Sequence, residues 1–346
     1  MFKELGYRLP EDLKDSDDAT YLDQGAFPIS TLLVGRPFDK KSRSKESDPY
    51  YKVRAFHEVE IFIAGSVGKD FSGMVEIEAE DENNFKVEFG LLAANYNFSK
   101  ELNFQLVWGP TFWSDPYGLI ANQFRLTRGK VALISQKFGG KSGITLNDNA
   151  QNVIATGRIA ERLFYSAGIS GRSGDAEGED AENIHLRLAY DIRKDIMLGL
   201  FALQGKQKIM ENDIMIKDLE FSRIGLDFKA NYGNTYFQGA YLVAADDKTD
   251  GAGNTVSGED KNNAFTFQMY HILKKGKTKK PLFVPLLRYD SFESNDGDDT
   301  SDEITLNVSY YLKENAKAYV EYWKQLSVPG NASKKSRATV QVQVGF

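Results

Sequence analysis

The sequence predicts an all-β protein, a sixteen-stranded antiparallel transmembrane β-barrel with one long inward-folding loop. Strand-like segments recur along the chain, with apolar and polar residues in alternation. Short turns and long polar loops alternate between these segments. The last segment, 336–346, has one apolar face, and its exposed edge would invite aggregation unless it were paired. Pairing this segment with the first strand would close a barrel.

Composition agrees with this fold and excludes several others. The 346 residues carry a net charge of −6, and 41% are hydrophobic. There is no run of 18 or more apolar residues, which excludes a membrane-spanning helix, whereas a barrel needs only alternate apolar residues. The absence of cysteine excludes disulfides, cysteine-ligated zinc, iron–sulfur clusters and covalently attached c-type haem. No signal peptide opens the sequence, and the strands favour a mature or truncated form over a cytosolic protein.

The elements follow in order along the chain. Residues 1–26 are polar and acidic, and we expect them to form a periplasmic arm ahead of a barrel at 27–346. Most predicted strands have at least the roughly 9–11 residues that a tilted strand needs to cross a bilayer. They are 27–37, 52–65, 70–81, 85–97, 102–109, 150–158, 160–170, 182–193, 195–206, 217–230, 234–245, 261–273, 280–292, 302–313, 316–326 and 336–346. Their even number is that of single-chain bacterial outer-membrane barrels.

The connections fall into two classes. Short turns are expected at 68–69, 99–100, 159, 194, 233, 274–279 and 314–315. Long loops are expected at 38–51, 110–149, 171–181, 207–216, 246–260, 293–301 and 327–335. The connection at 82–84 is the exception, a short one among the long loops. Short periplasmic turns and long extracellular loops are typical of outer-membrane barrels, and this sorting favours a barrel over a β-sandwich.

Alternation predicts which side chains face lipid and which line the lumen. The outward set includes Val53, Ala55, Val59, Ile61, Ile63, Val75, Ile77, Ala79, Ile184, Leu186, Leu188, Ile224, Leu226, Phe228, Ile304, Leu306 and Val308. The inward set includes Arg54, Glu58, Glu60, Glu76, Glu78, Glu80, His185, Arg187, Asp191, Arg223, Asp227, Lys229, Thr305, Asn307 and Ser309. A charge on the lipid face near the midplane would cost about 2–4 kcal/mol, and these strands avoid it. We therefore expect a polar, wet interior, as in a pore.

The loop at 110–149 is the longest, and a structureless loop of this length needs a reason. We expect it to fold into the lumen and form a constriction, with Arg125, Arg128 and Lys130 facing the acidic wall of Glu76, Glu78 and Glu80. The transverse field of such an arrangement would sort solutes by charge and dipole. Alternatively, these charges pair only to hold the loop in place, and both interpretations stay open. The lumen charge is mixed and lacks the basic track that a phosphate-selective pore would need.

Metal sites are not predicted. The glutamates at 76, 78 and 80 could bind a cation, but arginine or lysine neighbours are the favoured partners. Acidic loops at 175–182, 246–260 and 296–303 are interpreted as solvated surfaces, with divalent-cation bridges to lipopolysaccharide as the alternative. The second of them fails as an EF-hand, because Lys248 and Ser257 stand where ligands are needed.

Catalytic residues are not predicted either, and we expect no enzyme, no cofactor and no nucleic-acid partner. The three histidines, His57, His185 and His271, lie in predicted strands far apart in sequence. The lumen-facing His185 is interpreted as a wall residue, with a metal or haem ligand as the alternative. There is no nucleophile elbow, phosphate loop or dinucleotide motif. An outer-membrane hydrolase would require His185 beside a serine and a carboxylate.

Some segments resemble a known family. The C-terminal run 342–346 (VQVGF) resembles the closing strand of Gram-negative porins. The runs 97–105 (NFSKELNFQ), 114–117 (SDPY) and 125–128 (RLTR) resemble porins of the phosphate-selective-porin-like superfamily. The resemblance implies a passive diffusion channel for small hydrophilic solutes or ions in the bacterial outer membrane, in contact with lipid and lipopolysaccharide and associating as a homotrimer.

The opening run 2–7 (FKELGY) resembles the segment that joins haem motif to barrel in fused monohaem cytochrome–porins. This resemblance implies an electron-transfer alternative, in which the chain is the barrel of a cytochrome–porin system. The chain has no Cys-x-x-Cys-His motif and does not attach haem covalently. Under this alternative, an upstream segment or a partner cytochrome would supply the haem.

Overall fold

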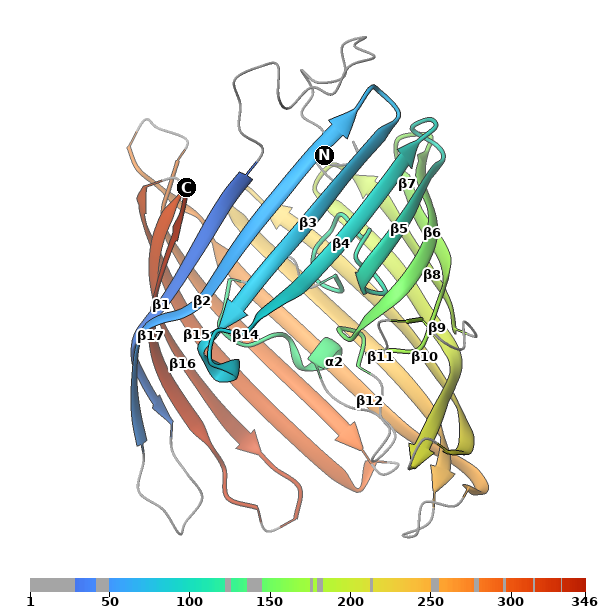
Figure 1. Cartoon of the computed structure of the whole chain (residues 1–346). Helices are drawn as coiled ribbons and strands as arrows, with labels where there is room; N and C mark the ends of the chain where they lie inside the picture. Colours follow the sequence, from blue (N-terminus) through green and yellow to red (C-terminus); the bar gives the residue numbers. More distant parts are fainter. Residues whose placement is uncertain are drawn as a thin grey trace.

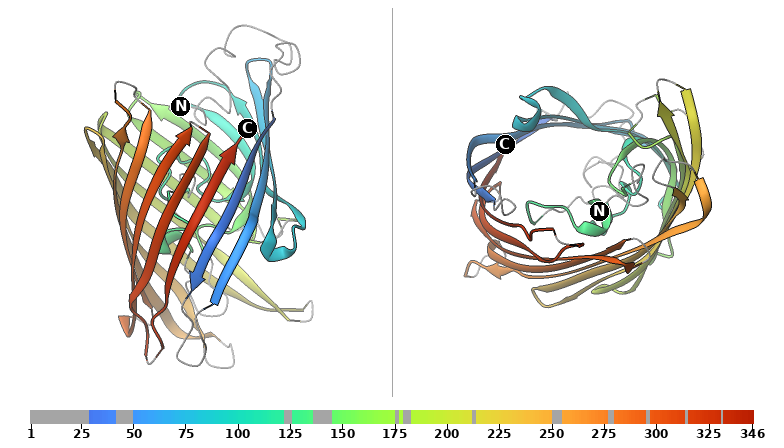
Figure 2. Two further views of the ribbon diagram at one scale, coloured as in Figure 1. Left: turned by 90° about the vertical axis from the view of Figure 1, so that its left-hand side faces the viewer. Right: turned by 90° about the horizontal axis from the view of Figure 1, so that it is seen from below.

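The strands of this chain form one antiparallel sheet that closes into a barrel (Figures 1 and 2). The computed structural model describes residues 29–41, 50–121, 126–135, 145–174, 177–178, 183–211, 214–249, 255–276, 280–294, 297–313, 315–330 and 332–346. Each strand pairs with its neighbours in sequence, and the first also pairs with the last. The predicted fold class is confirmed. The expected arm at 1–26 lies outside the described residues and stays a prediction.

The barrel has sixteen strand positions, because β13 continues β12 and pairs with the same neighbour, β14. The first eight strands are β1 (Ile29–Lys41), β2 (Tyr50–Val67), β3 (Phe71–Glu80), β4 (Val87–Asn97), β5 (Asn103–Pro110), β6 (Asn149–Ile159), β7 (Leu163–Ser170) and β8 (Asn183–Arg193). The others are β9 (Ile196–Glu211), β10 (Ile214–Tyr232), β11 (Thr235–Thr249), β12 (Thr255–His271), β13 (Leu273–Lys274), β14 (Pro281–Ser294), β15 (Asp299–Lys313), β16 (Ala316–Ser327) and β17 (Ser336–Gly345). All sixteen predicted strands are present, with ends shifted by no more than six residues.

The described helices are short. They are the 3-10 helix η2 (Asp81–Asn83) and the α-helix α2 (Ala132–Ser135). No helix in the described ranges is long and apolar enough to cross a membrane. The β3–β4 connection is short, as predicted, and folds as η2.

Tight turns join the strands at one end of the barrel. Gly68 and Gly233 lie in two of these turns with φ of 58° and 61°, a conformation that favours glycine. The start of β1 and the end of β17 lie at the same end of the barrel as these turns (Figure 1). This arrangement agrees with the predicted sorting of connections.

The seam between the first and last strands closes the barrel. Leu33 pairs with Val344, and the register continues through a bulge to Lys41 and Arg337. At the end of the seam, the Thr31 and Phe346 backbones exchange hydrogen bonds of 2.7 and 3.0 Å. The predicted pairing of 336–346 with the first strand is confirmed. It removes the unpaired edges that an open sheet would expose.

A disulfide between Leu33→Cys and Val344→Cys should form across this seam. Both residues lie on the outer face of paired strands, and the native chain has no cysteine to compete. Residues opposite each other in a β-ladder are close enough for a disulfide. On a non-reducing denaturing gel, the oxidised double variant should migrate as a monomer with a compact, reductant-sensitive mobility.

The pair Leu33→Cys and Val340→Cys is the matched control. Val340 pairs with Phe38 instead, so its Cβ lies several residues along the strand from that of Leu33. This pair should stay reduced under the same oxidation. Equal yields for the two pairs, or intermolecular dimers only, would contradict the closed seam.

The two faces of the strands follow the predicted alternation. On β10, Ile224 and Leu226 are more than half exposed, whereas Arg223 is 0% and Asp227 is 5% exposed. The same holds on β8, where Ile184 is exposed and His185 and Arg187 are buried. On these two strands the apolar side chains therefore form the outer face, and the charged side chains of Arg187, Arg223 and Asp227 lie inside.

The interior is less uniformly polar than predicted. Apolar side chains of β9–β12 point inward and are buried, among them Phe201, Leu203, Phe221, Leu242 and Ala244. They are covered by apolar residues of the segment that connects β5 and β6. The prediction of a wet lumen is thus wrong for this part of the wall, because a long inner segment needs an apolar core of its own.

Candidate functional site

The segment between β5 and β6 lies inside the barrel (Figure 2, right). We call its described residues, 111–121, 126–135 and 145–148, the inner loop. It includes α2, which contacts β11, β12 and β14. The segment therefore folds inward, as its length predicted.

The first part of the inner loop is anchored by polar side chains on β7, β8 and β10. The Ser114 and Ser166 hydroxyls lie 2.8 Å apart. Arg187 donates from Nε to Asp115 Oδ1 at 3.0 Å and from Nη2 to Asp227 Oδ2 at 2.9 Å. One buried guanidinium thus joins a loop carboxylate to a wall carboxylate, an arrangement of strong charge-assisted hydrogen bonds.

Tyr117 extends this first anchor. Its hydroxyl donates to Asp191 Oδ2 at 2.9 Å, and Arg158 Nη1 donates to the same oxygen at 2.6 Å. Burial raises the pKa of the Tyr117 hydroxyl well above its ordinary value, so it keeps its proton and remains a donor. The edge of its ring packs on Phe164.

Two arginines predicted to line the pore do not face open lumen. Arg187 and Arg223 are both 0% exposed. The inner loop covers Arg187, and Arg223 is occupied by Asp246, which accepts from Nη2 at 2.7 Å. Asp227 is also buried, beside Arg187. Arg187 and Asp227 therefore hold the inner loop on the wall, whereas Arg223 joins β10 to β11 through Asp246.

An apolar core fixes the middle of the inner loop. Its residues on the loop are Phe112, Leu119, Ile120, Val131, Leu133, Ile134 and Leu146. They pack on the inward apolar residues of β9–β12, and Leu133 and Ile134 of α2 are 0% exposed. Burying a Leu or Ile side chain stabilises by roughly 1.5–3 kcal/mol, so this contact holds the loop firmly on one side of the lumen.

The second part of the inner loop is anchored on the other side, to β1, β14, β16 and β17. Arg128 donates from Nη1 to Asp39 Oδ1 at 2.6 Å, and its backbone N–H donates to Glu321 Oε2 at 2.7 Å. Arg288 Nη1 donates to Thr127 Oγ1 at 2.7 Å and to the Gly129 carbonyl at 3.0 Å. The inner loop is thereby attached to the barrel wall at separated places.

Five arginines gather around this second anchor, and we call them the arginine cluster. They are Arg36, Arg54, Arg128, Arg288 and Arg337. Arg36 and Arg54 are register partners on β1 and β2, and the charges of Arg54 and Arg128 act on Arg36. The guanidinium groups of Arg288 and Arg337 both lie beside Gly129.

An acidic wall lies next to the arginine cluster, on β2 and β3. It consists of Glu58, Glu60, Glu76, Glu78 and Glu80. Glu58 is the register partner of Glu80, and Glu60 is that of Glu78. The carboxylates of Glu76 and Glu78 lie over Gly90 of β4. The residues on β3 are half-buried, whereas Glu58 and Glu60 are 6% and 7% exposed.

Of the predicted constriction residues, Arg128 lies away from the acidic wall. Arg128 contacts Asp39 and Glu321, not the acidic wall that the sequence suggested. Lys130 contributes its backbone carbonyl to Arg288 at 3.3 Å. Arg125 lies outside the described residues. For Arg128, the contacts with Asp39 and Glu321 therefore agree with the alternative interpretation, in which the charge pairs to hold the loop in place.

Several residues of the site were missed by the sequence interpretation. Arg288 and Asp290 are neighbours at alternate positions of β14, and Glu321 lies between the outward Val320 and Tyr322 on β16. Alternation would have placed all three in the lumen. Asp39 could not be found this way, because it fell in a predicted loop.

His185 has no partners for catalysis in the described part of the chain. It is 1% exposed, and neither ring nitrogen has a hydrogen-bond partner there. Its ring lies edge-on to Phe112, with centroids 6.0 Å apart. The grouping of histidine, serine and carboxylate that a hydrolase would need is not formed around it.

Comparison with known proteins gives a likeness in structure only. No protein-family model matches the chain, and no curated protein matches it. Among solved structures, the anion-selective porin from Comamonas acidovorans has a TM-score of 0.66 at 12% identity, over 92% of this chain and 99% of the porin. The chain has a porin fold.

Two further porin-fold matches agree. The outer-membrane channel DcaP of Acinetobacter baumannii has a TM-score of 0.62 at 12% identity, over 92% of this chain and 97% of DcaP. OmpF of Salmonella typhi, solved in complex with daunomycin, has a TM-score of 0.59 at 13% identity, over 92% of this chain and 97% of OmpF. The porin fold therefore covers nearly the whole chain.

Proposed function

We propose that this protein is a porin of the bacterial outer membrane, a passive diffusion channel for small hydrophilic solutes or ions. The observation that carries the proposal is the inner loop, which lies within a closed barrel and is fixed to separated places on the wall. A loop held in this way narrows a passage without filling the barrel. The likeness to solved porins and channels supports the same function.

The constriction lies where the inner loop, the arginine cluster and the acidic wall meet. Positive guanidinium groups on β1, β14 and β17 and negative carboxylates on β2 and β3 face the same lumen. Such an arrangement sets up a field across the passage, which orients polar solutes and sorts ions by charge. In this proposal the half-buried glutamates on β3 interact with passing ions, whereas the buried ion pairs position the loop.

The outer face supports placement in a membrane. Aromatic residues gather on it near the short-turn end of the barrel, as in the interfacial girdles of membrane barrels. They are Phe71, Tyr96, Phe104, Tyr232, Phe283, Tyr310 and Phe346. With the short turns in the periplasm, the opposite rim would meet lipopolysaccharide, and the expected partners are therefore lipid and lipopolysaccharide.

Association as a homotrimer is part of this proposal. The strands β3–β8 have only 8–11 residues, whereas β9–β12 have 15–19. The outer face of the short strands has an apolar groove of about 740 Å³, which is lined partly by Ile63, Val75, Leu106 and Val153. OmpT of Vibrio cholerae was solved in a trimer form. Mass determination in detergent should give three chains per particle, and a monomer would contradict this assembly.

Liposome swelling tests the proposed function directly. Vesicles containing the folded protein should swell in iso-osmotic solutions of small sugars, at rates that fall steeply as solute size increases. Vesicles containing the heat-unfolded protein are the control and should not swell. Swelling no faster than in protein-free vesicles, with correctly folded protein inserted, would contradict a diffusion channel.

No second function is proposed. The electron-transfer alternative would require haem from another segment or a partner, because the chain has no cysteine for covalent attachment. The hydrolase alternative would require partners around His185 that the described residues do not supply. Neither alternative is favoured by an observation on the structure.

A further inference from the structure

A bulge in β2 brings together three side chains that could share a metal ion. Val34 of β1 pairs with Glu58 and Arg36 pairs with Arg54, so β2 has extra residues between these positions. As a result His57 and Glu58, although adjacent in sequence, are 3% and 6% exposed. Simple alternation would have placed them on opposite faces.

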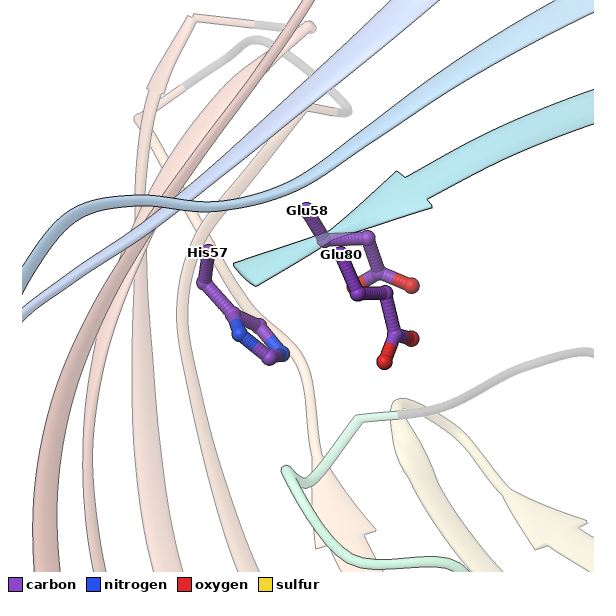
Figure 3. Close-up of side chains that lie close together, drawn as sticks. All are labelled: His57, Glu58 and Glu80. Carbon is purple, nitrogen blue, oxygen red and sulfur yellow. The ribbon is translucent and has the colours of Figure 1, made fainter. Parts of the chain in front are cut away.

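Glu80 completes the group from the neighbouring strand. It is the register partner of Glu58, and ligand atoms of His57, Glu58 and Glu80 all lie within 4.8 Å of one another. In Figure 3 the His57 ring and the two carboxylates converge on the same space. One imidazole nitrogen and two carboxylate oxygens thus meet at the lumen side of the β2–β3 pair.

Asp81 orients the imidazole for this role. Its Oδ1 lies 2.8 Å from His57 Nδ1, and a carboxylate can only accept. Arg54 Nη1, a donor, also lies near Nδ1, at 3.1 Å. We assign the ring proton to Nδ1 because the contact with Asp81 is the shorter of the two, and this tautomer leaves the lone pair on Nε2 for a metal. A carboxylate that fixes the tautomer of a histidine is the usual companion of a metal-bound imidazole.

Glu58 is buried, and among the described residues it has no direct contact to a counter-charge. In the part of the chain that the structure describes, it has no hydrogen bond and no ion pair, although it is 6% exposed. It also faces the like charge of Glu80 directly across the ladder, an unfavourable arrangement. Arg54 does not relieve it, because this arginine pairs with Asp81 and Glu82 at 3.3 and 2.9 Å. The charge of Arg36 acts on Glu58, but its Nε donates to Gln341 Oε1 at 2.7 Å.

Two neighbouring groups are weaker candidates. His57, Asp81 and Glu82 also lie within reach of a common ion, but Arg54 already neutralises their carboxylates. Glu58, Glu60 and Glu78 form a cluster of carboxylates alone. Both groups share a member with the first group.

We propose that His57, Glu58 and Glu80 bind a divalent transition-metal ion of the Zn²⁺ class in the wall of the pore. Two carboxylates and a neutral imidazole supply two negative charges, which one dication balances. An imidazole ligand favours Zn²⁺ and its first-row neighbours over Ca²⁺ and Mg²⁺, which prefer all-oxygen sites. Three protein ligands leave a coordination position open to water from the lumen. A bound dication would also reduce the negative charge of the acidic wall.

Zinc binding to the folded protein in detergent, after treatment with EDTA, tests this proposal. The wild type should bind one Zn²⁺ per chain in a competition titration with a chromogenic chelator. Glu58→Gln should weaken binding at least roughly 100-fold, because even the loss of a group that orients a ligand costs about 10–100-fold. Asp81→Asn should fall within that smaller range. Millimolar Ca²⁺ or Mg²⁺ should not displace the zinc.

Glu88→Gln is the matched control. Glu88 lies on β4 opposite Glu78 and is half-exposed, outside the proposed ligand set. This variant should keep the wild-type affinity within about twofold. Wild-type protein that binds no zinc, or Glu58→Gln and Glu80→Gln proteins that bind it as tightly as the wild type, would overturn the proposal. Zinc should also raise the unfolding temperature of the wild type, a readout that does not depend on the folding of any variant.

The binding assay is separate from the proposed channel function. Zinc affinity is measured in detergent without any transport, and liposome swelling is measured in EDTA without zinc. A failure to bind zinc therefore does not contradict the channel function, and a failure to swell does not contradict the metal site. Glu58→Gln removes a like-charge repulsion in the metal-free protein and should fold at least as well as the wild type.

Discussion

Replacing Arg187 with methionine should destabilise the folded barrel by about 3–5 kcal/mol, the range for breaking a buried ion pair by removing one partner. The change leaves the buried carboxylates of Asp115 and Asp227 without their shared counter-charge. Because Asp115 belongs to the inner loop, the first anchor should loosen as well. Single-channel conductance should then increase and become noisier than in the wild type.

Arg193→Met is the matched control on the same strand. Arg193 is 64% exposed and, among the described residues, pairs only with Asp195 at 3.3 Å, so its loss should cost less than about 1 kcal/mol. Gly199→Ala reaches the buried network from another side, since a Cβ there would collide with Arg187 and Asp227. It should also destabilise the barrel. Denaturant unfolding in detergent measures all three, and equal stability of the Arg187 and Arg193 variants would contradict the anchor.

Replacing the three glutamates on β3 together, by Glu76→Gln, Glu78→Gln and Glu80→Gln, should lower the ratio of cation to anion permeability several-fold. These half-buried carboxylates face the lumen beside the arginine cluster. Without them, the positive potential of the arginines dominates the passage. Under a potassium chloride gradient, the reversal potential should move toward the value for chloride. EDTA is present throughout, to keep metal ions from the wall.

A second triple variant separates local from overall charge. Glu161→Gln, Glu220→Gln and Glu259→Gln change the net charge equally, at exposed positions away from the acidic wall. This variant should keep the wild-type reversal potential, because exposed charges more than a Debye length of about 10 Å away are screened at 0.1 M salt. If both triple variants shift the potential equally, the acidic wall is not the selective element.

Much of the fold could be predicted from the sequence, because a barrel leaves a repeated local signature. Alternation located all sixteen strands and assigned Ile224 and Arg223 to opposite faces. The unpaired edge of 336–346 indicated the seam with the first strand. The length of the loop after 109 indicated that it folds inward. The strand assignments depend on alternation, which acts within a few residues, and the seam depends on the need to pair both edges of the sheet.

The site was harder to predict, because its geometry depends on departures from those rules. One bulge in β2 turns both His57 and Glu58 inward, and alternation gives no sign of a bulge. Likewise, alternation does not show whether Arg128 contacts the acidic wall or the carboxylates of Asp39 and Glu321. Only the path of the inner loop decides that it contacts Asp39 and Glu321.

The apolar core under the inner loop was missed for a related reason. Phe201, Leu203 and Leu242 alternate with apolar outward neighbours, so their strands are hydrophobic on both faces. Such runs are typical of strands buried on both sides. The sequence therefore carried a signal that something covers the inner face of β9–β12, and the inner loop is what covers it.

Planar-bilayer recording of the purified wild type tests the central claim most directly. Addition of the folded protein to a lipid bilayer in potassium chloride should produce discrete, ohmic conductance steps of reproducible size. The step size should reflect a passage narrowed by the inner loop and should increase in the Arg187→Met variant. A correctly folded barrel that inserts into the bilayer but never conducts would contradict the proposal that this protein is a channel.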